Sequence, residues 1–216
     1  MMFLRFGVPA FVFLAILFTA AGRLDVWPFW AYVGVMYVIA ATVYTLLVRW
    51  SPALVAERLR PPSDRDRATR RLVVLPFAAH LIVAGLDARF GWSALPVPVI
   101  VAGLAMVAAG FLLVGWTLAT NPFASSAVRV QHEREHQVIS HGPYAIVRHP
   151  MYLAVLLVCL GAGPALASWW AGLALLPVVP VFVRRTLIED AMLQRDLPGY
   201  TEYASRVRWR AVPGIF

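Results

Sequence analysis

The chain has 216 residues, of which 61% are hydrophobic and only 14% are charged, whereas a soluble domain normally carries about one quarter charged residues. This composition excludes an ordinary soluble fold and indicates a polytopic α-helical membrane protein. The formal net charge of +8 does not require a nucleic-acid partner, because anionic lipid headgroups attract arginine by roughly 1 kcal/mol per residue near the membrane surface.

Four apolar runs predict membrane-spanning helices at residues 3–21, 28–48, 72–90 and 95–119, since about 20 apolar residues are needed to cross the hydrocarbon core. The first run resembles a signal peptide but is interpreted as the first span. A fifth apolar run, residues 150–183, contains Gly161, Gly163 and Pro164 near its middle. They belong to GAGPALAS, residues 161–168, a break that predicts a tight hairpin of two shorter helices.

The placement of the arginines predicts the orientation in the membrane. All 19 basic residues are arginines, with seven at residues 49–71, three at 129–148 and six at 184–210. By the positive-inside rule these segments and both termini lie on the cytoplasmic side of the inner membrane. We expect an all-α helical bundle in which residues 1–119 form an N-terminal transmembrane part. Residues 120–216 would add a cytoplasmic loop, the helical hairpin and an interfacial tail.

The most informative stretch is HQVISHGPYAIVRHPMYLA, residues 136–154. Pro143 and Pro150 fix the backbone on either side of Arg148 and His149, and Pro150 suits the first turn of a helix. Anchoring at the headgroup level explains one arginine and one tyrosine, but not two prolines that frame a histidine. The pattern therefore predicts that Arg148 and His149 are held at a helix start at the membrane edge.

Charged side chains also gather where the last apolar helix leaves the membrane. Two arginines and two acids fall within residues 184–190, and Arg185 and Glu189 share a helix face because they are four residues apart. A local lattice of salt bridges is the alternative to a functional cluster. Tyr200 and Tyr203 are expected to pack on a short interfacial helix.

The segment HEREH, residues 132–136, matches the H-E-x-x-H pattern in which two histidines on one helix face bind zinc. The segment is poor ground for a long helix. We therefore expect no metal there and interpret its first four residues as the polar face of a loop. His141 and Glu189 could serve as third ligands, which leaves a membrane zinc protease as an alternative.

Two separated motifs carry a family resemblance. GPYAIVRHPMY, followed after one helical hairpin by EDAML and LPGYTEYASRVRWRAVP, resembles the isoprenylcysteine carboxyl methyltransferase family of integral membrane methyltransferases. It is also similar, more distantly, to the phospholipid N-methyltransferases. The resemblance covers residues 121–216 and starts at NPFASSAV. The first two predicted spans carry none of it.

The resemblance implies that residues 120–216 are a methyltransferase core with a cytoplasmic pocket. This pocket would bind S-adenosylmethionine where the helical hairpin meets the cytoplasmic loops. The resemblance further implies a lipophilic or lipidated acceptor, with a carboxylate or a lipid headgroup as the methylated group. The catalytic positions are Arg185, which approaches the acceptor, Glu189 and Arg206. The implied cofactor contacts are His136, Gln137, Val138, Ile139, Tyr144, Arg148, His149, Tyr152, Glu189 and Asp190.

Three departures from the family pattern leave the acceptor open. Ala154 stands where a glycine is common, Asp190 replaces the second glutamate of an acidic pair, and LPG at residues 197–199 replaces F-G. We predict a membrane methyltransferase whose partners are its lipophilic substrate and the membrane lipids. An NADPH-dependent enzyme like the sterol reductases and a non-enzymatic scaffold are further alternatives, but the scaffold leaves the paired motifs unexplained.

Overall fold

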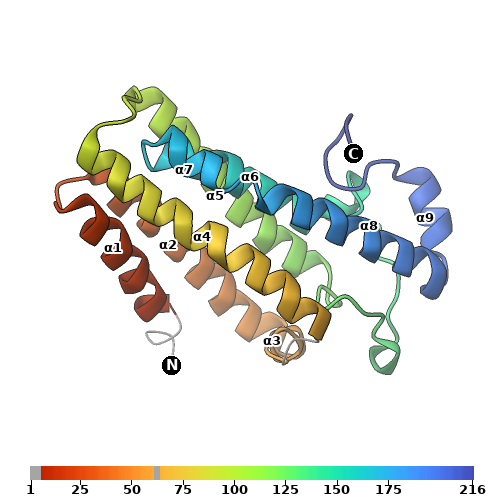
Figure 1. Ribbon diagram of the computed structural model, residues 1–216. Coiled ribbons are helices and arrows are strands. Elements are labelled where there is room, and N and C mark those ends of the chain that lie inside the picture. The colour runs from red at the N-terminus through yellow and green to blue at the C-terminus, as the bar shows by residue number, and fades with distance from the viewer. Residues whose placement is uncertain (1–5, 61–63) are drawn as a thin grey trace.

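The protein is a bundle of helices (Figure 1). The structure, a computed structural model, describes residues 6–60 and 64–216, with the backbone alone for residues 64–71. As predicted, the fold is all-α, and no strand occurs among these residues. The α-helices are α1 (Val8–Ala21), α2 (Trp27–Trp50), α3 (Pro52–Arg58), α4 (Asp64–Phe90), α5 (Val97–Thr120), α6 (Pro150–Ala165), α7 (Trp169–Ala174), α8 (Val178–Asp196) and α9 (Tyr200–Arg206), and two 3₁₀ turns, η2 (His132–Arg134) and η3 (Gly142–Ala145), lie between α5 and α6.

Prolines begin most of the long helices. Pro28, Pro98 and Pro150 occupy the first or second position of α2, α5 and α6, where an amide donor would have no partner within the helix. The α6 start at Pro150 confirms the prediction from the two prolines that frame Arg148 and His149. Because these helix starts are fixed locally, the sequence also fixes which residues lie at the ends of the bundle.

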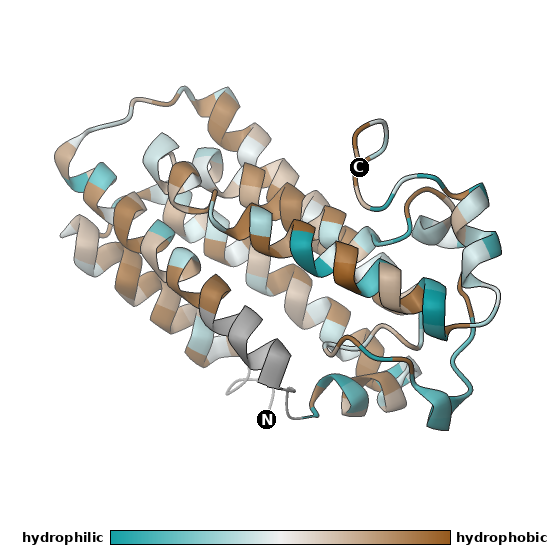
Figure 2. Ribbon diagram, turned by 45° about the vertical axis from the view of Figure 1, so that its right-hand side comes forward, coloured by the Kyte–Doolittle hydropathy of each residue, from teal (hydrophilic) through white to brown (hydrophobic). Residues whose placement is uncertain are grey.

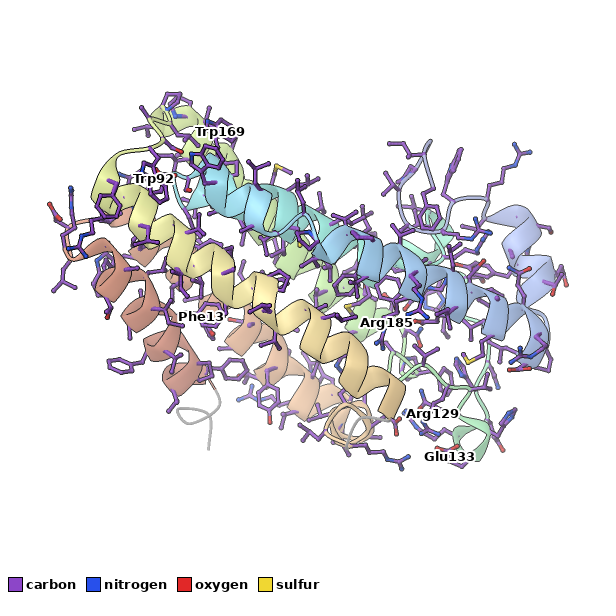
Figure 3. All side chains as sticks on the ribbon, in the orientation of Figure 1. Phe13, Trp92, Arg129, Glu133, Trp169 and Arg185 are labelled. Carbon is purple, nitrogen blue, oxygen red and sulfur yellow. The ribbon has the colours of Figure 1, made fainter. Side chains whose placement is uncertain are left out.

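Four helical stretches are long and apolar enough to cross a membrane: Trp27–Trp50, Leu72–Phe90, Val97–Thr120 and Trp169–Asp196. The first predicted span, residues 3–21, corresponds to the shorter apolar helix α1, and its first residues lie outside the described part. Figure 2 shows apolar residues along the bundle and hydrophilic residues at the end that carries η2 and α9. Trp92 and Trp169 lie together at the opposite end (Figure 3), where tryptophans favour the membrane interface. The protein is an integral membrane protein.

The apolar run of residues 150–183 forms a hairpin, as predicted, and the chain turns in the second half of GAGPALAS, residues 161–168. Helix α6 continues through Pro164 to Ala165, and the chain reverses at residues 166–168, where Ala167 has φ +57°. The Ser168 hydroxyl then caps α7 by accepting a hydrogen bond from the Ala171 amide (3.0 Å). The turn therefore lies inside the predicted break, while Gly161, Gly163 and Pro164 themselves belong to α6.

Gly161 lies in a close contact between α6 and α5. A Cβ atom at Gly161 would lie 2.7 Å from the carbonyl oxygen of Gly103 on α5, and one at Gly103 would lie 2.4 Å from the Ala165 amide nitrogen. Small residues let helix backbones approach closely, which is a main source of helix association in membranes. This close contact holds α6 against α5, and it thereby fixes where the start of α6 lies at one end of the bundle.

Candidate active site

A cavity of about 400 Å³ lies at the end of the bundle that holds α3, the α5–α6 connection and α9. Its walls come from the coil after α5, the start of α6, one face of α8 and the inner face of α9. Five of its lining residues on α8 follow helical spacing: Phe182, Arg185, Glu189, Met192 and Leu193. The volume falls within the range usual for small-molecule sites.

The start of α6 is fixed from two sides. Gly142 has φ +60°, and a Cβ atom there would lie 2.9 Å from the Thr120 hydroxyl, so only glycine fits this turn. The backbone amides of Arg148 and His149 donate to the Trp209 and Arg210 carbonyls of the C-terminal tail, at 2.9 and 2.7 Å. Both side chains are buried, so the RHP segment is an ordered part of the cavity wall.

Asp190 is the centre of a buried polar cluster behind this wall. Its carboxylate accepts two hydrogen bonds from Arg148 (2.8 and 2.9 Å), one from the Tyr200 hydroxyl (3.0 Å) and one from Arg210 (3.1 Å). The Nε2 atom of His149 lies 3.1 Å from it. Only 2% of the Asp190 side chain is exposed, and it is not among the residues that line the cavity. The predicted cofactor contact at Asp190 is therefore corrected, because its oxygen atoms are occupied by other protein groups.

Glu189, one residue earlier, faces the cavity. It accepts a short hydrogen bond from the Tyr152 hydroxyl, and Tyr152 in turn accepts one from Arg185 Nε (3.0 Å). The Nδ1 atom of His149 lies 3.9 Å from the Glu189 carboxylate. With 28% of its side chain exposed, Glu189 retains accessible carboxylate surface toward the cavity, so the row Arg185–Tyr152–Glu189 offers both a cation and an anion to a ligand.

The segment His136–Gln137–Val138–Ile139 forms another part of the lining. The His136 ring stacks on Phe123 with 4.5 Å between ring centres. Its Nδ1 atom accepts a hydrogen bond from the Gln131 amide (3.3 Å), which leaves Nε2 to carry the proton in the neutral form. Burial, together with nearby cations such as Arg134, lowers the pKa of His136 to about 4. This imidazole is therefore neutral at pH 7.

Three tyrosines form an aromatic wall. The Tyr144 hydroxyl accepts a hydrogen bond from the Asn121 amide group (2.9 Å), the Tyr203 hydroxyl donates to the Tyr144 carbonyl (2.7 Å), and the Tyr200 and Tyr203 rings are 5.4 Å apart. Burial raises the pKa of all three phenols, so each remains protonated. Tyr200 and Tyr203 were expected only to pack on an interfacial helix, but they also line the cavity.

The structure does not bring Arg206 to the cavity. Its side chain is 67% exposed on α9, 3.9 Å from the Glu202 carboxylate, and it is absent from the lining. Two regions that the sequence did not indicate do reach the cavity: Arg58 at the end of α3, and Val73 and Val74 on α4. The mixed charges and prolines of residues 51–71 are typical of a solvated connection with a short interfacial helix, not of a cavity wall.

The HEREH segment does not form a zinc-binding helix. Residues 132–134 make a single 3₁₀ turn, and Glu135 has φ +52°, which ends the turn. His132 is exposed, whereas His136 stacks on Phe123. Among the described residues no group of three or more histidine, cysteine, aspartate or glutamate side chains is placed to hold a metal ion.

Comparison of the sequence with known proteins relates this chain to membrane methyltransferases. Residues 98–198 match the family model of phospholipid methyltransferases. A probable protein-S-isoprenylcysteine O-methyltransferase of rice is 29% identical over 82 residues, 37% of this chain and 43% of the rice protein. The resemblance to the integral membrane methyltransferases is confirmed.

Two bacterial relatives cover a similar share. A cobalt-zinc-cadmium resistance protein, CzcN of Cupriavidus metallidurans, is 31% identical over 44% of each chain. A nickel-cobalt-cadmium resistance protein, NccN of Alcaligenes xylosoxydans xylosoxydans, is 30% identical over 44% of this chain and 45% of its own. The chain thus spans less than half the length of the curated relatives that it matches.

The matched methyltransferase segment contains most of the cavity wall, but not all of it. Three parts of the cavity wall fall within residues 98–198: the coil after α5, the start of α6 and the lining face of α8. Arg58, Val73, Tyr200 and Tyr203 lie outside this segment. Residues before and after the matched segment therefore complete the wall of the cavity.

Proposed function

We propose that this protein transfers a methyl group from S-adenosylmethionine to a lipophilic acceptor at the cytoplasmic face of the inner membrane. The observation that carries the proposal is the row Arg185–Tyr152–Glu189 beside residues 136–139, within one cavity and within the segment that matches the methyltransferases. The placement of the arginines at residues 49–71, 129–148 and 184–210 supports the cytoplasmic orientation of this end and of both termini.

The residues of the cavity fit the chemical groups of this cofactor. Glu189 presents an accessible carboxylate that suits an ammonium or ribose hydroxyl groups, and the cavity edges of His149 and His136 are polar. The tyrosine faces suit a sulfonium, since a cation over an aromatic ring gains about 0.5–2 kcal/mol. S-adenosylmethionine, when bound, supplies an electrophilic methyl group on sulfur.

Methyl transfer breaks one carbon–sulfur bond and forms one bond from carbon to the acceptor atom, while sulfur becomes a neutral thioether. The role of this chain is to position the acceptor and to exclude water, because an in-line displacement gains most from alignment. Arg185 is placed to orient a carboxylate acceptor, which has no proton to lose. For an amine acceptor, Glu189 is the group placed to take the proton.

The acceptor would enter from the bilayer between α4 and α8. Val73 and Val74 on α4 and Phe182 on α8 line the cavity, and Val74 is 64% exposed on the surface of the bundle. An apolar mouth beside Arg185 suits a lipid or lipidated molecule with a polar reacting group. We keep the division into an N-terminal bundle (residues 1–119) and a methyltransferase core (residues 120–216) as part of the same proposal.

Calorimetric titration of the detergent-purified chain with S-adenosylhomocysteine tests the proposal. We expect saturable binding that survives a chelator and is weakened at least roughly tenfold in Glu189→Gln, which loses a charge-assisted contact. The matched control is Glu202→Gln, whose carboxylate is 78% exposed on α9 and should bind as the wild type does. No binding by the wild-type protein, with binding of NADPH or stoichiometric zinc instead, would overturn the proposal.

The acceptor class can be read from the product. Membranes incubated with the protein and methyl-labelled S-adenosylmethionine should yield label in the organic phase. Release of that label as methanol by mild base identifies a carboxyl methyl ester, whereas base-stable label identifies an N-methylated headgroup. Arg185→Ala should reduce this turnover while leaving S-adenosylhomocysteine binding nearly unchanged.

A further inference from the structure

The coil from Asn121 to His136, here called the strap, crosses the cavity without regular structure apart from η2. It contributes a continuous part of the lining, from Phe123 to Ala127, together with Arg129. The hydrogen bonds within the strap are local, as between Asn121 and Ala124 or between Gln131 and Arg134, so they do not fix where it lies relative to the helices. Its position must be set by the elements that bind it.

Helix α3 binds the strap through a buried carboxylate. Glu57 is 4% exposed, and its Oε1 atom accepts hydrogen bonds from the Ser125 hydroxyl (3.1 Å) and from Arg129 Nη2 (2.9 Å). The next residue, Arg58, donates from Nη1 to the Ala124 carbonyl (2.8 Å). Two adjacent residues of α3 therefore hold three residues of the strap.

On its other side the strap contacts the proposed catalytic row. Arg185 Nη2 donates to the Ser126 carbonyl (2.8 Å), while Nε of the same guanidinium donates to the Tyr152 hydroxyl (3.0 Å). Ser126 follows Ser125, which Glu57 holds. The contacts thus run without a gap from α3 through the strap to the guanidinium that faces the acceptor. Figure 3 shows Arg129, Glu133 and Arg185 at the same end of the bundle.

We propose that Glu57 is a positioning residue that fixes the strap over the cavity, so that α3 is part of the site. This inference rests on the proposed function and adds to it a residue outside the segment, 98–198, that matches the methyltransferases. A buried charge is tolerated only when it is paired. Because the partners of Glu57 include two strap residues, the paired carboxylate favours the single position of the strap that places Ser126 against Arg185.

The test compares Glu57→Gln with Glu133→Gln in the full chain. Glu133 contacts the same guanidinium, Arg129, at 2.6 Å, and it also lies 3.5 Å from Arg60, two residues after α3. Because Glu133 is 49% exposed, water screens both contacts, and they contribute little to the attachment of the strap. Two quantities are measured: amide hydrogen exchange of residues 121–136 without ligand, and the Kd for S-adenosylhomocysteine.

We expect Glu57→Gln to speed exchange in the strap, leave α5 and α6 unchanged and raise the Kd roughly tenfold, the equivalent of one charge-assisted hydrogen bond. Glu133→Gln should match the wild type in both. Unchanged exchange and Kd in a folded Glu57→Gln protein would overturn the inference. So would a lower thermal midpoint with an unchanged Kd, because that result describes a purely structural role.

If Glu57→Gln does not fold, Ser125→Ala replaces it, because this variant removes one strap-side partner and leaves the carboxylate paired with Arg129. The Ser125 hydroxyl also accepts from the Ala127 amide (3.1 Å), so that amide is left out of the comparison. Faster exchange of the other strap amides in Ser125→Ala supports the inference, and wild-type exchange refutes it. The exchange experiment needs no ligand. Absence of S-adenosylhomocysteine binding by the wild type would therefore count against the proposed function alone, while the exchange result still decides the role of Glu57.

Discussion

Replacement of Asp190 by asparagine should destabilise the whole C-terminal part of the site. The substitution keeps the size of the side chain but removes the only negative charge in the buried cluster behind the cavity. Arg148, whose side chain is 6% exposed, would keep at most one neutral acceptor and would face an NH₂ donor in place of the second carboxylate oxygen. Arg148 Nη1 also donates to the Val207 carbonyl just after α9 (2.8 Å), so one attachment of the tail would be weakened.

The magnitude follows from this burial. Removing one partner of a buried ion pair costs about 3–5 kcal/mol, because it leaves an uncompensated charge. For a chain of 150–250 residues each kcal/mol lowers the thermal midpoint by about 2–4 °C. The expected fall is therefore roughly 6–20 °C. The Kd for S-adenosylhomocysteine should rise as well, because His149 and Tyr200 both contact Asp190 and line the cavity.

The assay is thermal unfolding in detergent together with hydrogen exchange of the Arg148 and His149 amides, which are bonded to the tail carbonyls. Asp196→Asn is the control, because Asp196 is 35% exposed and pairs with the exposed Arg195; such pairs contribute at most about 1 kcal/mol. A midpoint for Asp190→Asn within about 2 °C of the wild type, with unchanged amide exchange, would refute the role of the buried cluster.

Three further predictions concern the bundle, the strap and the HEREH segment. Gly103→Ala should lower the thermal midpoint, because its Cβ would lie 2.4 Å from the Ala165 amide nitrogen. Gly34→Ala is the control and should leave the midpoint unchanged, because no atom lies within 4 Å of the new Cβ. A fall of the same size in both variants would show that the close α5–α6 contact is unimportant. Because the folded-state pKa of His136, about 4, lies below its unfolded value of 6.5, its contribution to stability is complete above about pH 6.5 and is lost as the pH falls toward 4. Thermal midpoints from pH 7.5 to 4.5 should therefore fall less in His136→Gln than in the wild type, and equal slopes would contradict this. His132→Ala should retain S-adenosylhomocysteine binding, and elemental analysis that found zinc in the wild type but not in this variant would restore the zinc hypothesis.

The sequence predicted helices and their starts well because those signals are local. A membrane-spanning helix needs only a long apolar run, and prolines such as Pro28 and Pro150 act on the residues beside them. The exact place of the turn within residues 161–168 was not predicted, because a glycine such as Gly161 serves either a turn or a close helix contact. The residue that decides between them is Gly103, 58 positions earlier, and the sequence does not show that the two meet.

For the adjacent acids Glu189 and Asp190, too, the sequence predicted only part of what the structure shows. Successive residues on a helix point about 100° apart, so Glu189 can line the cavity while Asp190 turns away from it, as the structure shows. Spacing from Arg185 correctly placed Glu189 on its face, and the two form a row with Tyr152. That Asp190 turns toward Arg148 and the tail depends on where residues 200–210 fold back, which is a tertiary fact.

The clearest failure of sequence reasoning, at Glu57 and Arg58, indicates how the site is assembled. Both stand in a segment of mixed charge and prolines, a composition that normally marks a solvated loop. The partners that bury Glu57, Ser125 and Arg129, lie 68 and 72 residues later. From the sequence alone a charged residue of this kind is expected to be exposed, since burying a charge without a partner costs too much free energy. The N-terminal part of the chain is therefore more than a membrane anchor for a methyltransferase core: it supplies the buried carboxylate against which the core's strap is held, and with Arg58 and Val73 it supplies part of the cavity wall.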